Sequence, residues 1–169
     1  MVRALLEGRK TMTRRLAEKK SWNAVSKPSR RWQAVKPGDR LWVRESFCAG
    51  RPALASGAGI IPMKGGIPPG RKIVYREDWD GPDEPPWRPP FSLPRWASRL
   101  TLTVTATKIE RLQEITREDE IAEGTPDGMF FDALWASIHG DGSWAANPEI
   151  VALTFAVEKC NIDQPGEKQ

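Results

Sequence analysis

A nine-residue stretch near the N-terminus, EGRKTMTRR at positions 7–15, concentrates side chains that could do chemistry. It places the amine of Lys10 and the hydroxyls of Thr11 and Thr13 beside Gly8, a residue type that often ends helices because it tolerates a left-handed backbone. Threonine favours extended structure, so these groups are expected where a short helix passes into a strand. That position suits acid–base chemistry by the lysine amine. The same composition also fits a solvated basic turn.

Composition limits what kind of protein this is. The chain has 169 residues, 39% of them hydrophobic and 28% charged, which fits one soluble globular domain with a proper core. Fifteen prolines and fourteen glycines predict long loops. Eight tryptophans could be core anchors or platforms on which bases stack. The net charge of +4 favours an anionic partner such as RNA or a nucleotide but is too small to imply tight duplex binding.

Residue content alone argues against several classes of site. Cys48 and Cys160 stand far apart with no CxxC spacing, so we expect no disulfide framework and no metal or other cofactor. Because His139 is the only histidine, acid–base chemistry is expected from Lys, Glu, Asp or Tyr. The sequence shows no signal peptide, and no apolar run approaches eighteen residues. We therefore expect a cytoplasmic protein without a membrane partner.

The N-terminal third predicts a short helix over 2–7, a strand over 11–16 and a polar loop over 18–38. That loop interleaves basic residues with tryptophans, which suits either a base-stacking surface or an ordinary loop covering the core edge. A Pro-Gly-Asp turn at 37–39 then predicts a strand over 41–47. Arg44 and Glu45, near the end of this strand, would line a polar pocket or mark where the strand leaves the core.

Residues 49–94 form a proline- and glycine-rich insert in which only 72–76 has the pattern of a strand. Inserts this long are functional lids or disordered segments. Strict alternation predicts a long strand over 99–112, with a bulge near 107–108 because Ile109 breaks the period. Thr116 and Asp119 form a capping-box pattern for a helix ending at Gly124.

A second helix over 130–140, a last strand over 149–157 and a polar tail over 161–169 complete the pattern. The expected fold is α+β: a small bent barrel of mostly antiparallel strands flanked by helices, in one domain covering 1–160.

Four segments in this order resemble the ASCH-domain family of the PUA-like superfamily, most of all its phage-type members: GRKTMTRR, KPGDRLWVRE, PRWASRLTLTVT and ITREDEIAEG. The resemblance covers most of residues 2–159 outside the insert and implies a PUA-like barrel with a cleft for a nucleobase. The chain is similar to bacterial members of this family that remove the acyl group from N4-acetylcytidine. In them a lysine and a threonine of a GRKTxTxR segment act with a glutamate that ends a later helix, which implies catalytic roles for Lys10, Thr13 and Glu123. Arg14 departs from the apolar residue usual in that segment.

The implied reaction needs Lys10 neutral, so that it can deprotonate Thr13 while Glu123 positions water or carries a proton to the leaving amine. Because positions 10 and 13 of a regular strand face opposite ways, the strand must begin after Lys10. Substrate contacts are expected, with lower priority, from six further residues: Arg9, Arg15, Trp42, Arg44, Glu45 and Tyr75. The expected partner is a modified nucleoside or base. The alternatives are a non-catalytic RNA-binding module, with Lys10 as a phosphate contact, or an RNA-cleaving protein.

Overall fold

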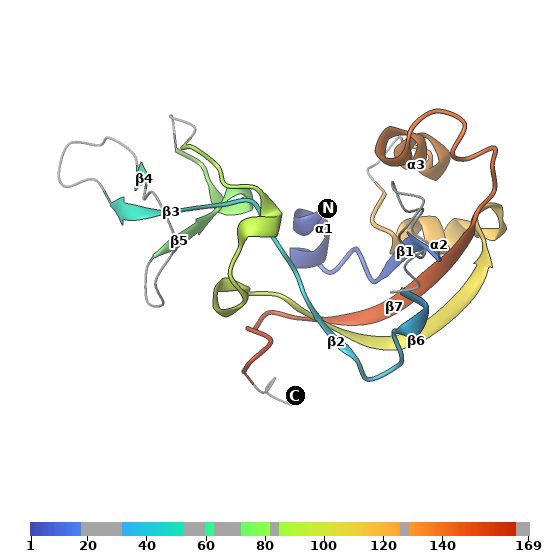
Figure 1. Cartoon of the computed structure of the whole chain (residues 1–169), viewed down its shortest axis with the longest axis horizontal. Coiled ribbons are helices and arrows are strands. Elements are labelled where there is room, and N and C mark those ends of the chain that lie inside the picture. The colour runs from blue at the N-terminus through green and yellow to red at the C-terminus, as the bar shows by residue number, and fades with distance from the viewer. Residues whose placement is uncertain (18–31, 53–59, 63–71, 82–84, 126–128, 165–169) are drawn as a thin grey trace, which may run out of the picture. The chain divides into compact units, whose positions relative to one another are not determined.

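The computed structural model describes residues 1–17, 32–52, 60–62, 72–81, 85–125 and 129–164 (Figure 1). Within these ranges the chain forms two compact units. The first comprises most of residues 1–40 together with 103–157, and the second comprises 41–102 together with 158–169. The prediction of a single domain over 1–160 stays a prediction, and each unit is described by itself.

The first unit is built on a curved sheet in the order β1-β7-β6-β2, with β1 at one edge. Strand β1 (Met12–Leu16) runs antiparallel to β7 (Glu149–Glu158), with Arg14 opposite Ala152. Strand β6 (Thr101–Arg111) follows β7 along its length (Figure 1). The Leu112 amide, just after β6, bonds to the Pro148 carbonyl, just before β7, so these two strands are also antiparallel. Strand β2 (Arg40–Trp42) completes the order.

Three helices accompany this sheet, and all three were predicted within one or two residues. Helix α1 (Val2–Leu6) ends before Gly8, whose φ is +74°. Helix α2 (Arg117–Ala122) begins at the capping box that the sequence predicts, in which the Asp119 amide donates to Thr116 Oγ1. Helix α3 (Phe131–His139) ends at Gly140.

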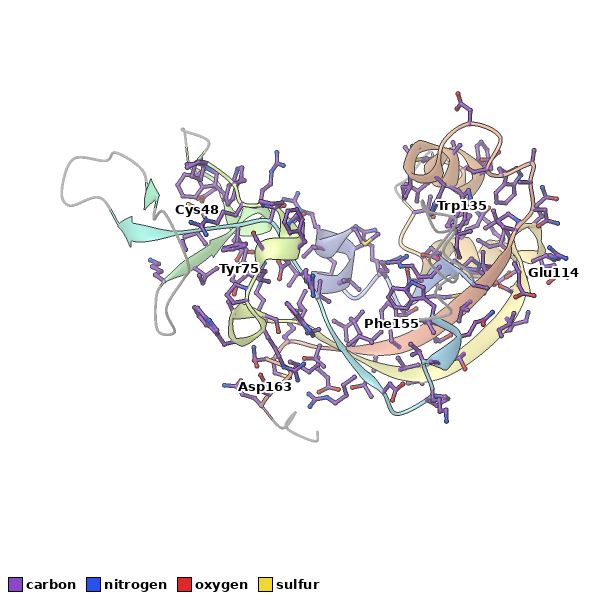
Figure 2. All side chains as sticks on the ribbon, in the orientation of Figure 1. Cys48, Tyr75, Glu114, Trp135, Phe155 and Asp163 are labelled. Carbon is purple, nitrogen blue, oxygen red and sulfur yellow. The ribbon has the colours of Figure 1, made fainter. Side chains whose placement is uncertain are left out.

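The core of the first unit lies between α3 and the sheet. Alternate residues of β1 and β7 share a face, so Met12 and Leu16 lie on the same side as Ile150 and Ala152. Phe131 and Trp135, one turn apart on α3, pack onto that side, as do the remaining members of the cluster: Leu112, Ile115, Leu134 and Trp144. Figure 2 shows Trp135 projecting from α3 toward the strands. Arg14 occupies this same face of β1, where an apolar residue would be the default.

The strand expected over 41–47 is wrong in part. Strand β2 ends at Trp42, residues 43–46 have no regular structure, and β3 (Phe47–Pro52) begins a different sheet. Glu45 lies in this break, 1% exposed, and its carboxylate accepts hydrogen bonds from the Arg99 guanidinium. A buried carboxylate needs such a partner.

The insert contributes more structure than predicted. In the second unit β3 pairs antiparallel with β4 (Ile60–Pro62) and with β5 (Ile73–Tyr75), and only β5 was expected. The cluster beneath this sheet contains Phe47, Ala49, Leu93 and Ala97, and partly buried aromatic residues surround it.

The bulge expected near 107–108 stays a prediction. Strand β6 runs from Thr101 to Arg111, with Ile109 exposed and Glu110 buried, so a charged residue is buried near the end of the strand.

The described residues are thus α+β with a curved, mainly antiparallel sheet, as predicted at that level. Five basic residues of the 18–38 loop, Lys19, Lys20, Lys27, Arg30 and Arg31, lie outside the described ranges, as do residues 165–169 of the polar tail. No helix in the described part of the chain combines the length and the apolar character needed to cross a membrane.

Candidate active site

The segment carrying Lys10 is held between two helices by its backbone. The Lys10 amide donates to the Ala4 carbonyl of α1, and the Thr11 amide donates to the Ala122 carbonyl at the end of α2. Strand β1 begins only at Met12, so Lys10 lies in the connection ahead of the strand. A site that uses both Lys10 and Thr13 requires the strand to begin after Lys10, and the structure meets this condition.

Lys10 and Glu123 form a buried ion pair. Lys10 Nζ donates to Glu123 Oε2 at 2.6 Å and to the Glu123 backbone carbonyl, also at 2.6 Å. The two residues are 4% and 7% exposed. Glu123 is the C-cap of α2, whose last carbonyls lack partners inside the helix, so the lysine satisfies one of them while pairing with the side chain. The structure therefore brings together two of the three residues predicted to be catalytic.

The environment of Lys10 favours loss of its proton. Burial lowers the pKa of the ammonium below its ordinary value of 10.5 and outweighs the opposing effect of the Glu123 carboxylate. The guanidinium groups of Arg15 and Arg14 lower this pKa further. These are the effects through which proteins prepare a lysine to act as a base.

Arg14 holds the acidic residues around this pair in place. Its Nη2 lies 2.9 Å from Glu110 Oε1 and 2.6 Å from Asp119 Oδ2, and its Nη1 lies 3.6 Å from Glu123 Oε1. Asp119 and Glu123 stand one turn apart on α2, so a single helix face presents both carboxylates to β1. The departure from the ASCH-type segment at position 14 is therefore the centre of a buried charge network.

Thr13 is oriented by Arg15. Arg15 Nη1 donates to Thr13 Oγ1 at 2.7 Å and to the Arg14 carbonyl at 2.8 Å, and the guanidinium lies over the Trp32 ring, 5.7 Å from its centroid. The Thr13 hydroxyl, which accepts this charge-assisted bond, keeps its own proton for donation. Thr13 is buried beside the site and is not among the residues that line its cavity.

A cavity of about 280 Å³ opens beside the ion pair. One wall is polar, from Lys10, Arg14, Arg15 and Glu123, and a second wall comes from α3 and is largely apolar. The residues of the α3 wall are Phe131, Leu134, Trp135, Ile138 and His139. A mixed wall with a few converging polar groups is typical of a site for a small, largely uncharged molecule.

The sequence analysis did not assign Trp135 and His139 to the site. His139 stacks on Trp135 with ring centroids 4.1 Å apart, and both line the cavity. Burial and the Arg15 charge lower the pKa of His139 below 6.5, which keeps the imidazole neutral at pH 7. The sequence set aside acid–base chemistry by histidine because His139 is alone; the i, i+4 spacing of Trp135 and His139 was the signal available.

The other predicted substrate contacts divide between the units. In the first unit Arg15 lines the cavity, whereas Arg9 is exposed and pairs with Glu7. The rest belong to the second unit. There Arg44 lies 4.6 Å from the Trp42 ring centroid, and Arg99 lies over the Tyr75 ring at 4.1 Å while bonding Glu45.

Gly124 provides a test of the packing around Lys10. Its φ of +67° disfavours any other residue, and an added Cβ would lie 2.9 Å from Lys10 Cβ and 3.0 Å from Ala4 Cβ. We expect Gly124→Ala to lower the free energy of unfolding by about 2–3 kcal/mol, from backbone strain and overpacking together. Gly142→Ala is the matched control, because its φ is +76° but nothing lies within 4 Å, so strain alone should cost about 1 kcal/mol. Urea unfolding of both variants measures the difference; equal losses would contradict close packing on Lys10.

In the described part of the chain, no three His, Cys, Asp or Glu side chains gather as a metal ion would require. Comparison of the chain with models of known protein families, with curated proteins and with solved structures finds no match.

Proposed function

We propose that this protein is an amidohydrolase that removes the acyl group from N4-acylated cytosine, as nucleoside or free base. The observation that carries the proposal is the buried Lys10–Glu123 pair, set in the wall of a cavity whose other wall is aromatic and apolar. A lysine whose pKa is lowered can serve as a base, and the apolar wall suits a planar heterocycle. The resemblance to ASCH proteins and a PUA-like barrel built on the curved sheet belong to the same proposal.

In the proposed first step, neutral Lys10 takes the proton of the Thr13 hydroxyl as Oγ1 attacks the acyl carbonyl carbon. The Arg15 guanidinium, already bonded to Oγ1, stabilises the developing negative charge on that oxygen. The C–N4 bond breaks and the proton passes to N4, leaving cytosine and an acyl ester on Thr13. Water then hydrolyses the ester and releases the acid.

Glu123 is suited to move the proton in both steps. Its Oε2 accepts from Lys10, while its Oε1 is buried without a hydrogen-bond partner among the described residues. That oxygen can accept the N4–H of the bound amide and later orient the attacking water. The ring delocalises the N4 lone pair, which makes N4 a better leaving group than an alkyl amine. A lysine, a threonine and a glutamate can therefore suffice for the reaction.

The test is ultraviolet-monitored hydrolysis of N4-acetylcytidine and N4-acetylcytosine by the purified protein, with Thr13→Val and Thr13→Ser beside it. We expect Thr13→Val, which keeps the shape and loses the hydroxyl, to lower kcat by about 10³-fold. Thr13→Ser should keep most of the activity. Full activity in Thr13→Val would exclude Thr13 as nucleophile.

The dependence of activity and binding on salt concentration distinguishes the hydrolase from the RNA-binding and RNA-cleaving alternatives. Hydrolysis of a neutral nucleoside should respond little to ionic strength, whereas binding through phosphates weakens steeply. A folded protein with no turnover and salt-sensitive RNA binding would replace the hydrolase with an RNA-binding module.

A further inference from the structure

The wall that α3 gives to the cavity changes from buried to exposed along the helix. The residues of this wall recur at the spacing of one helix face. Trp135 is 3% exposed, whereas Ile138 is 58% exposed and His139 is also exposed. Lys10 and Glu123, in the polar wall, are 4% and 7% exposed. The cavity therefore has a deep end at the ion pair and a mouth beside the last turn of α3.

His139 presents a flat ring at this mouth. Its imidazole stacks on the indole of Trp135, with the ring centroids 4.1 Å apart and the planes at 29°. Because Trp135 covers one face of the imidazole and the residue is exposed, the accessible surface of the ring lies on its other face and its edges. Trp135 belongs to the core cluster, which fixes the plane of the stack. A third planar ring entering the cavity could extend this stack.

The charge state of His139 suits an uncharged ring. Burial and the nearby Arg15 guanidinium lower its pKa below 6.5, so the imidazole is neutral at pH 7. The other polar side chains that line the cavity are three cations and one carboxylate. Nucleobases stack on aromatic side chains, histidine included, and such stacking needs no counter-charge.

The proposed reaction determines which end of the substrate enters the cavity first. The amide at N4 must reach the buried Lys10–Glu123 pair, so the pyrimidine ring lies nearer the mouth. In the pyrimidine ring, N1 is opposite C4, so the ribose of a nucleoside would point out of the cavity. The ring itself is then placed beside the last turn of α3, which carries His139.

We propose that His139 is a specificity-determining residue, whose exposed imidazole face stacks on the pyrimidine ring of the N4-acylcytosine substrate. This inference rests on the proposed function. In this role His139 selects a planar aromatic leaving group and moves no proton, because stacking uses the face of the ring and leaves its nitrogens free.

The experiment compares two replacements of the ring. His139→Phe keeps a flat aromatic face and removes both nitrogens, whereas His139→Leu stays apolar and removes the flat face. We expect His139→Phe to keep kcat/KM for N4-acetylcytosine within about 3-fold, and His139→Leu to lower it by about 10-fold through KM. The loss should be the same for N4-acetylcytidine, because the ribose lies outside the stack. Ser137→Ala is the matched control: Ser137 is exposed on α3 but does not line the cavity, so neither kcat nor KM should change.

Four results would overturn the inference. Equal losses in His139→Phe and His139→Leu would assign the role to the imidazole nitrogens. A loss confined to N4-acetylcytidine would place the ribose on His139. No loss in either variant would show that the ring does not contact the substrate. A lower urea midpoint of unfolding in His139→Leu alone would show that the ring acts by holding Trp135.

Binding of the product tests the inference apart from turnover. In calorimetric titration with cytosine, the wild-type protein and His139→Phe should bind alike and His139→Leu about 10-fold more weakly. If the wild-type protein binds cytosine in this way without hydrolysing its acyl derivative, the hydrolase fails and the recognition stands. Turnover that His139→Leu leaves unchanged would keep the hydrolase and overturn the inference. If the wild-type protein neither binds cytosine nor hydrolyses its acyl derivative, both fail.

Discussion

Lys10→Met abolishes the proposed hydrolysis, lowering kcat for N4-acetylcytosine by about 10³-fold or more. Methionine fills much of the volume of the lysine stem but has no amine to take the Thr13 proton. Because Lys10 is 4% exposed and its Nζ is bonded only to Glu123 among the described residues, water is poorly placed to replace the amine. The measurement is the ultraviolet assay at saturating substrate.

Stability must be separated from chemistry in this variant. Removing one partner of a buried ion pair leaves the other charge uncompensated and costs about 3–5 kcal/mol. Lys10→Met therefore also destabilises the fold by leaving Glu123 unpaired. The control is Lys10→Met with Glu123→Gln, which removes both charges and keeps both shapes. We expect the double variant to recover most of the free energy of unfolding in urea and none of the activity. Activity in a folded double variant would exclude Lys10 as the base.

Lys10 also sets how the rate and the stability of the fold depend on pH. Its pKa in the folded protein lies below 10.5, so the fraction of neutral amine and the rate rise with pH until the folded pKa is passed. The unfolded chain binds the proton more tightly between the folded pKa and 10.5. The contribution of Lys10 to the free energy of unfolding therefore increases with pH across that window. A rate that falls as pH rises from 7 to 9, with the protein still folded, would contradict this assignment.

Local signals predicted the elements that carry the site. The capping box of Thr116 and Asp119 and the glycine at 124 set both ends of α2, which places Glu123 as its C-cap. Gly8 ends α1 in the same way. These effects act within one turn, so a single sequence displays them.

Long-range pairing could not be predicted in this way. Arg14 follows three other cations in the sequence and has the local pattern of a solvated turn, yet it is 2% exposed. Its burial depends on Glu110 and Asp119, which lie 96 and 105 residues further along the chain. The burial of Glu45 depends in the same way on Arg99, which lies 54 residues further along the chain. Strands β3 and β4 were missed because Pro52 and Pro62, at their ends, obscured short runs of strand-forming residues.

Arg14→Leu is expected to be the most destabilising single substitution in the first unit, lowering the free energy of unfolding by about 3–5 kcal/mol or more. Leucine is an apolar residue that forms strands acceptably, and Arg14 lies on the face of β1 that packs toward α3, so the position alone would favour leucine. We expect the lost ion pairs to outweigh this advantage. The substitution leaves Glu110 buried with only the exposed Lys108 beside it, and it removes a partner of Asp119. The matched control is Arg117→Leu, which breaks an exposed pair with Glu120 and should cost less than about 1 kcal/mol.

A second substitution distinguishes charge from shape. If the loss in Arg14→Leu comes from the stranded carboxylate, adding Glu110→Leu should recover about half of it or more, since a buried ion pair can be replaced by apolar residues at little cost. Asp119 would still accept from the Thr116 amide and Glu123 would still pair with Lys10, so the double variant should retain the cavity and measurable hydrolysis. Urea unfolding and the ultraviolet assay check both expectations. No recovery from Glu110→Leu would mean that Arg14 acts through packing with Phe131, over whose ring its guanidinium lies at 6.0 Å. The charge network would then be a consequence of the fold and would contribute little to holding it.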